Sequence, residues 1–169
     1  MSSIVITLVY CQALGAGIGA LTAVWGELAY IRAMRDGNID AAERAHLRAI
    51  GNGLRFGLIL LLLASFGFVV VAYMQGSTLQ PALSPDYWIL MALALVVIGV
   101  SWALARRRIP FALGSAALFA AWWFLVYFSF GWLSPLSFGA AVMSFIVATA
   151  IFYGVLYYVR LLASPSTGP

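Results

Sequence analysis

Apolar residues run along most of this chain in long stretches, and short polar segments separate them. A helix that crosses a bilayer needs roughly 20 mainly apolar residues. Strict alternation of apolar and polar positions, as in a membrane β-barrel, is absent. The pattern therefore predicts an all-α fold, an integral membrane bundle of five transmembrane helices that forms one domain over residues 1–169. We expect the helices at about residues 4–35, 40–74, 87–105, 110–131 and 135–162.

The polar separators carry the signals of turns and helix ends. Residues 75–86, "QGSTLQPALSPD", form a loop rich in Gly, Pro and Ser. "RRRIP" indicates a tight hairpin, with Pro110 suited to the first turn of the next helix. In "WLSPLS", Ser134 is placed to cap a helix whose first turn contains Pro135.

Composition places these helices in lipid. Hydrophobic residues make up 64% of the chain and charged residues only 8%, whereas soluble domains carry about 25% charged residues. So few charged side chains cannot cover the surface of a water-soluble domain of this size.

The basic residues, all arginines, fall in two of the four connections and at the end of the last predicted helix. Positively charged connections face the cytoplasm. We therefore expect the N-terminus outside, the C-terminus inside and a location in the bacterial inner membrane. Because topology explains the net positive charge, nucleic acid is not expected as a partner.

The first connection, about residues 32–55, holds most of the ionisable groups. Gly37 can end the first helix and Asp40 can cap the second. If both helices continue through this segment, we expect the hairpin to project beyond the membrane, with Gly51 and Gly53 as bend points. Arginine side chains in the first and third connections, together with Asn52, are candidate contacts for anions or lipid headgroups. The set is Arg44, Arg48, Asn52, Arg106, Arg107 and Arg108.

Glu27 is the only acidic residue within an apolar stretch. Charged groups at such positions are costly and are often functional. Arg55, at the start of the second apolar run, is a candidate partner, and a Glu27–Arg55 ion pair would join the first two helices. A proton or cation site is the alternative.

Small residues at four-residue spacing mark two surfaces for close helix packing. One surface consists of Gly15, Gly19 and Ala23, and the other of Ala140, Ser144 and Ala148. Each could face a helix of this chain or another subunit. Trp122 and Trp123 fall near the middle of the membrane, where they either pack against neighbouring helices or line a ligand.

Residues for common catalytic or metal chemistry are few. His46 and Cys11 are the only histidine and cysteine, so neither a zinc cluster of such ligands nor a bis-histidine haem site can form within one chain. Ser–His–Asp and Cys–His catalysis have no supporting constellation. "DGNIDAAE" matches the second half of a calcium-binding loop, but Arg32 and Met34 occupy the first ligand positions. We expect no metal site and no catalytic residues, and the sequence identifies no cofactor.

Two resemblances concern the first half of the chain. "RAHLRAIGN", Arg44 to Asn52, resembles the signature "RAHLNALEN" of MAPEG, a family of membrane enzymes that handle glutathione and eicosanoids. It implies a trimer of helical bundles with Arg44 and Asn52 near glutathione, although Arg48 and Gly51 replace the asparagine and glutamate of the family. The pattern "GxGxxA…GExxYxRAxRDGxI…E…L" resembles small uncharacterised multipass proteins of bacterial membranes.

The sequence therefore leads to three functional hypotheses. The first is a non-catalytic accessory or assembly subunit of a membrane complex, which contacts lipids and either other subunits or copies of itself. The second is a small transporter or channel, its pore lined by Thr22, Glu27, Ser65 and Ser101. The third is a glutathione-dependent enzyme similar to MAPEG.

Overall fold

The computed structural model describes residues 3–36, 41–78, 80–132 and 136–163. Within these ranges the chain forms five α-helices, one short 3₁₀ turn and no β-strand, so the predicted all-α fold is confirmed. The helix ends lie within three residues of those expected from the sequence. The elements are α1 (Ser3–Asp36), α2 (Ala41–Met74), η1 (Pro81–Leu83), α3 (Pro85–Ala105), α4 (Phe111–Ser129) and α5 (Phe138–Ala163).

All five helices are long and apolar enough to cross a membrane. The shortest, α4, has 19 residues and is about 28 Å long, close to the thickness of the hydrocarbon layer. α1 and α2 have 34 residues each and are longer than the membrane core requires. The chain is thus a multi-pass membrane protein.

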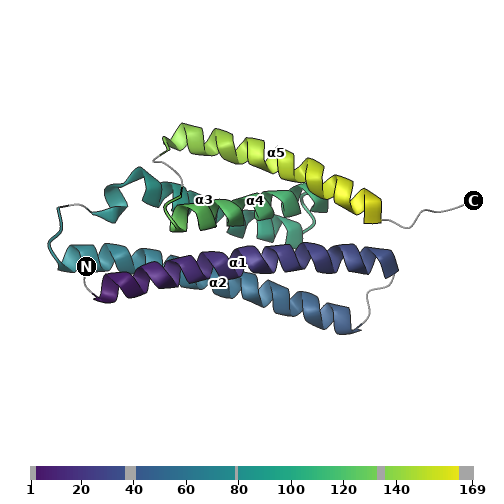
Figure 1. The fold of residues 1–169 in the computed structure, drawn as a ribbon, viewed down its shortest axis with the longest axis horizontal. Coiled ribbons are helices and arrows are strands. Elements are labelled where there is room, and N and C mark those ends of the chain that lie inside the picture. Colours follow the sequence, from purple (N-terminus) through teal and green to yellow (C-terminus); the bar gives the residue numbers. More distant parts are fainter. Residues whose placement is uncertain (1–2, 37–40, 79, 133–135, 164–169) are drawn as a thin grey trace, which may run out of the picture.

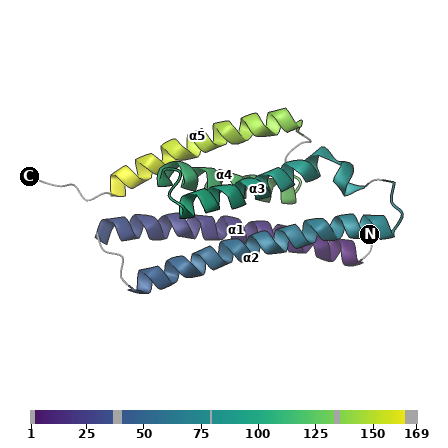
Figure 2. The same ribbon diagram turned by 180° about the vertical axis from the view of Figure 1, so that it is seen from behind.

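Successive helices run in opposite directions along the bundle (Figure 1). α1 and α2 form one long hairpin, and α3 and α4 form a second hairpin beside α1 (Figure 2). α5 lies along the other side of α4. α4 is therefore the central helix, in contact with α1, α3 and α5.

The alternation of direction brings the arginine-bearing segments to one end of the bundle. The end of α1, the start of α2, the α3–α4 turn and the end of α5 all lie there (Figure 1). Tyr30 stacks near Phe111, the first residue of α4, with ring centroids 4.3 Å apart. Residues 31–36 of α1 therefore extend beyond the start of α4, and the α1–α2 hairpin projects past the α3–α4 turn.

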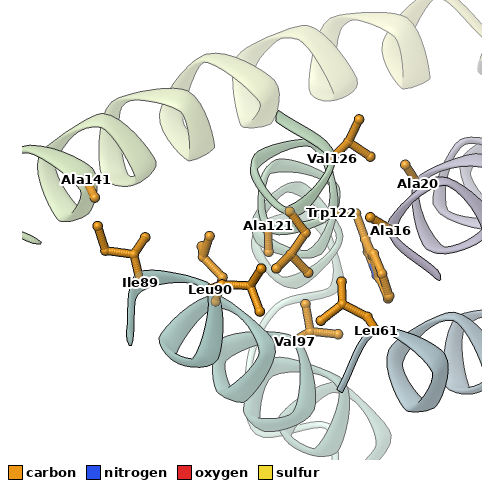
Figure 3. Packing of buried hydrophobic residues seen from close by; sticks show 12 residues of the cluster. Ala16, Ala20, Leu61, Ile89, Leu90, Val97, Ala121, Trp122, Val126 and Ala141 are labelled. Atoms are coloured by element: carbon orange, nitrogen blue, oxygen red, sulfur yellow. The ribbon is translucent and has the colours of Figure 1, made fainter. Parts of the chain in front are cut away.

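Trp122 is the centre of the apolar core. Its side chain is fully buried, and Figure 3 shows the indole ring between α4, the α1 residues Ala16 and Ala20, and Leu61 of α2. Of the two roles considered for this tryptophan, the structure shows packing against neighbouring helices.

Three helices end with the same hydrogen-bond pattern. After α2, Ser77 N–H donates to the Ala72 carbonyl and Gly76 N–H to the Tyr73 carbonyl, which is a Schellman motif. The equivalent bonds follow α4, where Gly131 takes the place of Gly76. Both glycines have positive φ, +58° and +66°, the left-handed conformation that glycine adopts without a steric penalty.

α3 ends in a third Schellman motif, but an arginine takes the glycine position. Arg108 N–H donates to the Ala103 carbonyl and Arg107 N–H to the Leu104 carbonyl. Arg107 has a φ of +53°, the only positive value of a non-glycine residue in the described ranges. The sharp turn into α4 therefore carries backbone strain that its counterparts at Gly76 and Gly131 avoid.

Some predicted helix ends cannot be compared. Gly37, Asp40, Ser134 and Pro135 lie outside the described residues. Pro110 directly precedes α4 as its N-cap, and α2 is one continuous helix through Gly51 and Gly53.

Candidate functional site

A buried ion pair joins α1 to α5 near the arginine-rich end. Nη2 of Arg160 lies 2.6 Å from Oε2 of Glu27, and the two side chains are only 9% and 11% exposed. The residues are 133 positions apart in the sequence. Because an unpaired charge is costly away from water, this contact fixes the end of α5 against α1.

The same nitrogen of Arg160 reaches a third helix. It donates to Oγ of the buried Ser115, on α4, over 2.7 Å. The Ser115 hydroxyl in turn donates to the Ala112 carbonyl over 3.2 Å. The guanidinium thus connects α1, α4 and α5 through one polar cluster, Glu27, Ser115 and Arg160.

Two aromatic rings cover this cluster. Cζ of Arg160 lies 5.0 Å from the centroid of the Tyr30 ring and 5.2 Å from that of Phe111. A guanidinium at such distances is attracted to the ring face, and more strongly where water is excluded. Tyr30 and Phe111 therefore stabilise the cation and shield the ion pair from solvent.

This arrangement neutralises a buried carboxylate and holds three helices in register. Nε of Arg160 is also buried and has no acceptor among the described residues. In the part of the chain that the structure describes, no three His, Cys, Asp or Glu side chains lie close enough together to hold a metal ion.

The sequence-based choice of Arg55 as the partner of Glu27 is wrong. Arg55 is exposed on α2, and Glu27 pairs with Arg160 instead. The register of the α1–α2 hairpin explains the difference. Cγ2 of Ile50 lies 3.4 Å from the position of a Cβ on Gly26, so Arg55 is more than one helical turn from the level of Glu27.

The other predicted anion contacts are distributed over the same end of the bundle. Arg48 and Asn52 are exposed on α2, as are Arg106, Arg107 and Arg108 at the end of α3. The guanidinium carbons of Arg106 and Arg108 lie 4.8 Å and 5.0 Å from the Trp102 ring centroid. The side chain of Arg44 lies outside the described part.

The first small-residue surface lies within the bundle. A Cβ on Gly15 would be 2.8 Å from the Gly57 carbonyl oxygen, and a Cβ on Gly57 would be 2.9 Å from the Gly19 nitrogen. The backbones of α1 and α2 are therefore in direct contact. A Cβ on Gly19 would overlap the Trp122 ring at 1.9 Å, while Ala23 packs at the edge of the core.

The second small-residue surface, on α5, is largely uncovered by this chain. Ala140 and Ser144 are exposed and Ala148 is half-buried. The buried side chains of α5 are instead Ala141 and Leu156, among its described residues. The small residues of α5 therefore do not serve the close helix packing seen between α1 and α2.

A pocket of about 230 Å³ opens at the end of the bundle opposite the arginines. Gln12, Ser65, Asp86 and Tyr87 contribute its polar groups. Of the expected pore residues, only Ser65 lines it. Ser101 is exposed on α3, and the Thr22 hydroxyl donates to the Ile18 carbonyl over 2.6 Å.

Sequence reasoning missed the roles of Ser115, Gly57 and Arg160 in these contacts. Arg160 was visible as the only arginine near the end of the last apolar run. In a five-helix bundle the end of α5 lies at the level at which α1 ends. This placement is a signal that could have identified Arg160 as the partner of Glu27. Gly57 forms a GxxxG pair with Gly53, at the same spacing as Gly15 and Gly19, and this signal could have identified it. Ser115 follows no motif that distinguishes it from other small residues.

Comparison of the chain with protein-family models, with curated proteins and with solved structures finds no match.

Proposed function

We propose that this protein is a non-catalytic accessory or assembly subunit of a larger complex in the bacterial inner membrane. The observation that carries the proposal is the exposed side of α5. This helix packs on α4 along one side, and among the described residues no other helix covers its exposed small residues, Ala140 and Ser144. In lipid, small residues promote helix association because they allow backbones to approach.

An adjacent apolar groove extends the same face. It has a volume of about 150 Å³ and lies between α3, α4 and α5, where Phe124, Phe138 and Phe145 contribute aromatic walls. Phe124 and Phe145 meet edge to face at 6.0 Å. A transmembrane helix of another subunit could pack on the small residues of α5 and place larger side chains in this groove.

The orientation we propose follows the arginines. Their end of the bundle faces the cytoplasm, with the N-terminus outside. A thiol reagent that cannot cross membranes should label Ser77→Cys in intact cells and should label Arg107→Cys only after lysis, both in a Cys11→Ala background. Labelling of both positions from outside would contradict this threading.

Photo-cross-linking in cells tests the subunit proposal. A photoreactive residue in place of Ser144 should give a discrete adduct with a different membrane protein, which mass spectrometry identifies. The matched control is Leu63, which is 64% exposed on α2 and should give no such adduct. Adducts with lipid alone, or only with copies of this chain, would overturn the proposal.

A small transporter is the second candidate function, and the pocket beside Ser65 favours it. The pocket reaches polar side chains within the helices and opens at one end of the bundle. Transport also requires a route past the Trp122 layer towards Glu27. In liposomes, a flux that Glu27→Gln alters would support this function, and a working flux assay insensitive to that change would remove Glu27 from the mechanism.

A further inference from the structure

The pocket at the arginine-free end combines three kinds of side chain that together indicate a ligand. It lies between α1, α2, η1, α3 and α4, and its volume is about 230 Å³. Aromatic side chains, two hydrogen-bonding groups and one carboxylate surround it. None of these groups belongs to the cluster of Glu27, Ser115 and Arg160.

The inner part of the pocket is polar and fixed. Ser65 is 1% exposed, and its hydroxyl donates to the Leu61 carbonyl over 2.8 Å. Gln12 donates from Nε2 to the Ser65 oxygen over 3.4 Å. A side-chain amide also has an acceptor oxygen, and among the described residues the Gln12 oxygen receives no hydrogen bond. The pocket therefore offers an acceptor to a ligand that carries a donor.

The walls are aromatic. Phe68 of α2, Tyr87 of α3 and Phe128 of α4 line the pocket from three different helices. Aromatic rings accommodate alkyl groups and also attract cations, most strongly where water is excluded. The combination suits a cation with an apolar surface better than a hydrated metal ion, which needs several oxygen ligands.

Charge makes the pocket selective for cations. Asp86 contributes an exposed carboxylate. The other acidic residues within the described helices, Glu27, Asp36 and Glu43, lie towards the opposite end of the bundle. The arginines are at that opposite end as well, so the potential around the pocket favours positive ligands. Asp86 also lies in the first turn of α3, where a negative charge stabilises the helix, and a test must separate this effect from binding.

We propose that this pocket binds a small organic ammonium ion. Asp86 pairs with its charge, Phe68, Tyr87 and Phe128 surround its alkyl groups, and Gln12 and Ser65 hydrogen-bond to a polar substituent. Such an ion could be a dissolved amine or the headgroup of a phospholipid, since both carry the same chemistry.

Calorimetry on the full chain, purified in an uncharged maltoside detergent, tests the proposal with choline as the probe. Choline should bind at least tenfold more tightly than 3,3-dimethylbutan-1-ol, which has the same shape without the charge. Asp86→Asn should weaken choline binding at least tenfold, and Phe128→Leu should weaken it severalfold. Equal binding of the neutral alcohol, or no heat with choline, would overturn the proposal.

Two controls separate binding from folding. Asp36→Asn removes the same charge at the far end of α1 and should leave choline affinity unchanged. Thermal unfolding of Asp86→Asn should show a folded protein, so that loss of affinity is not loss of structure. If Asp36→Asn weakens binding as much as Asp86→Asn does, net charge and not the pocket is responsible, and the proposal fails.

The source of the ammonium group is decided in nanodiscs. If phospholipid headgroups occupy the pocket, added choline should bind more weakly in phosphatidylcholine nanodiscs than in nanodiscs of an uncharged glycolipid, whose surface neither carries an ammonium group nor attracts cations. If the ligand is a dissolved amine, affinity should be the same in both. Absence of choline binding in both lipids would contradict an ammonium site of either kind.

Discussion

The contact between α1 and α2 and the attachment of α5 are opposite solutions to holding helices together in lipid. At Gly15, Gly19 and Gly57 the backbones touch directly, and the buried Trp122 packs against this contact. In α5 a Cβ on Gly139 or Gly154 would meet nothing within 4 Å, and the helix is held by an ion pair and by ring contacts such as Phe119–Phe152, 4.9 Å apart. Lipid tails are as apolar as the side chains on these helices, so burial of apolar surface does not favour helix association over contact with lipid. Close packing and polar bonds are what favour association.

This difference predicts that the two regions fail in different ways. Damage at the glycine contact should unfold the bundle as a whole, because α1, α2 and α4 meet there. Damage at the ion pair should release α5 while the other four helices remain packed.

Removal of the Trp122 side chain should have the largest effect. Trp122→Ala leaves a cavity beside Gly19 at the centre of the bundle and should lower the free energy of unfolding by about 4 kcal/mol. Unfolding in mixed micelles of maltoside and dodecyl sulfate measures the change. Trp123→Ala is the control, since Trp123 is only half-buried and should cost much less. An equal loss at both positions would contradict a special role for Trp122.

Gly19→Ala should be the next most damaging change. Its Cβ would lie 1.9 Å from the Trp122 ring, which is enclosed and cannot move aside, and overpacking of this kind costs about 3 kcal/mol. Gly17→Ala is the matched control in the same helix, since a Cβ there would meet nothing within 4 Å. The same unfolding experiment compares them, and equal stability would mean that α1 and α4 can separate without penalty.

Glu27→Gln should lower the free energy of unfolding by about 3 kcal/mol, because it leaves the buried Arg160 without its counter-charge. The loss should be local. In a Cys11→Ala background, a cysteine in place of Leu156, which is 8% exposed, should become reactive to thiol reagents, whereas one in place of Ala16 stays protected. The double variant Glu27→Gln/Arg160→Met should recover part of the stability, because no unpaired charge remains. Simultaneous exposure of both cysteines would show that α5 is not separable from the rest.

Arg107→Gly should have the smallest effect, and it should stabilise. Glycine at a φ of +53° relieves strain of about 1 kcal/mol. Arg106→Gly is the control, since Arg106 has a φ of −92° and glycine there gains nothing. If Arg107→Gly lowers stability instead, the arginine side chain stabilises the turn by more than its backbone strain costs.

The helices were predictable because hydropathy and length directly reflect the solvent around each segment. The separation of the arginines was predictable for a related reason. Alternate connections lie at the same end of a bundle, and with five crossings the end of the last helix lies there too. Glu27 was identified because an acid in an apolar run is conspicuous.

The partner of Glu27 was not predictable from local spacing. Arg55 follows Glu27 in the next helix, but side chains meet according to the register of the hairpin, and Gly26 lies beside Ile50. Register depends on the contacts of Gly15, Gly19 and Gly57, and a GxxxG pair marks a packing face without fixing which residues of the facing helix it meets. The pocket beside Ser65 combines five elements, so no segment alone could indicate it.

The separation of 133 positions between Glu27 and Arg160 has a consequence for biosynthesis. At about 5–20 residues per second, the ribosome adds the arginine roughly ten seconds after the acid. During that interval the carboxylate of the nascent chain has no guanidinium to neutralise it. A chain truncated before the last helix keeps an uncompensated acid near the membrane surface, and this local defect distinguishes an unfinished protein from a complete one.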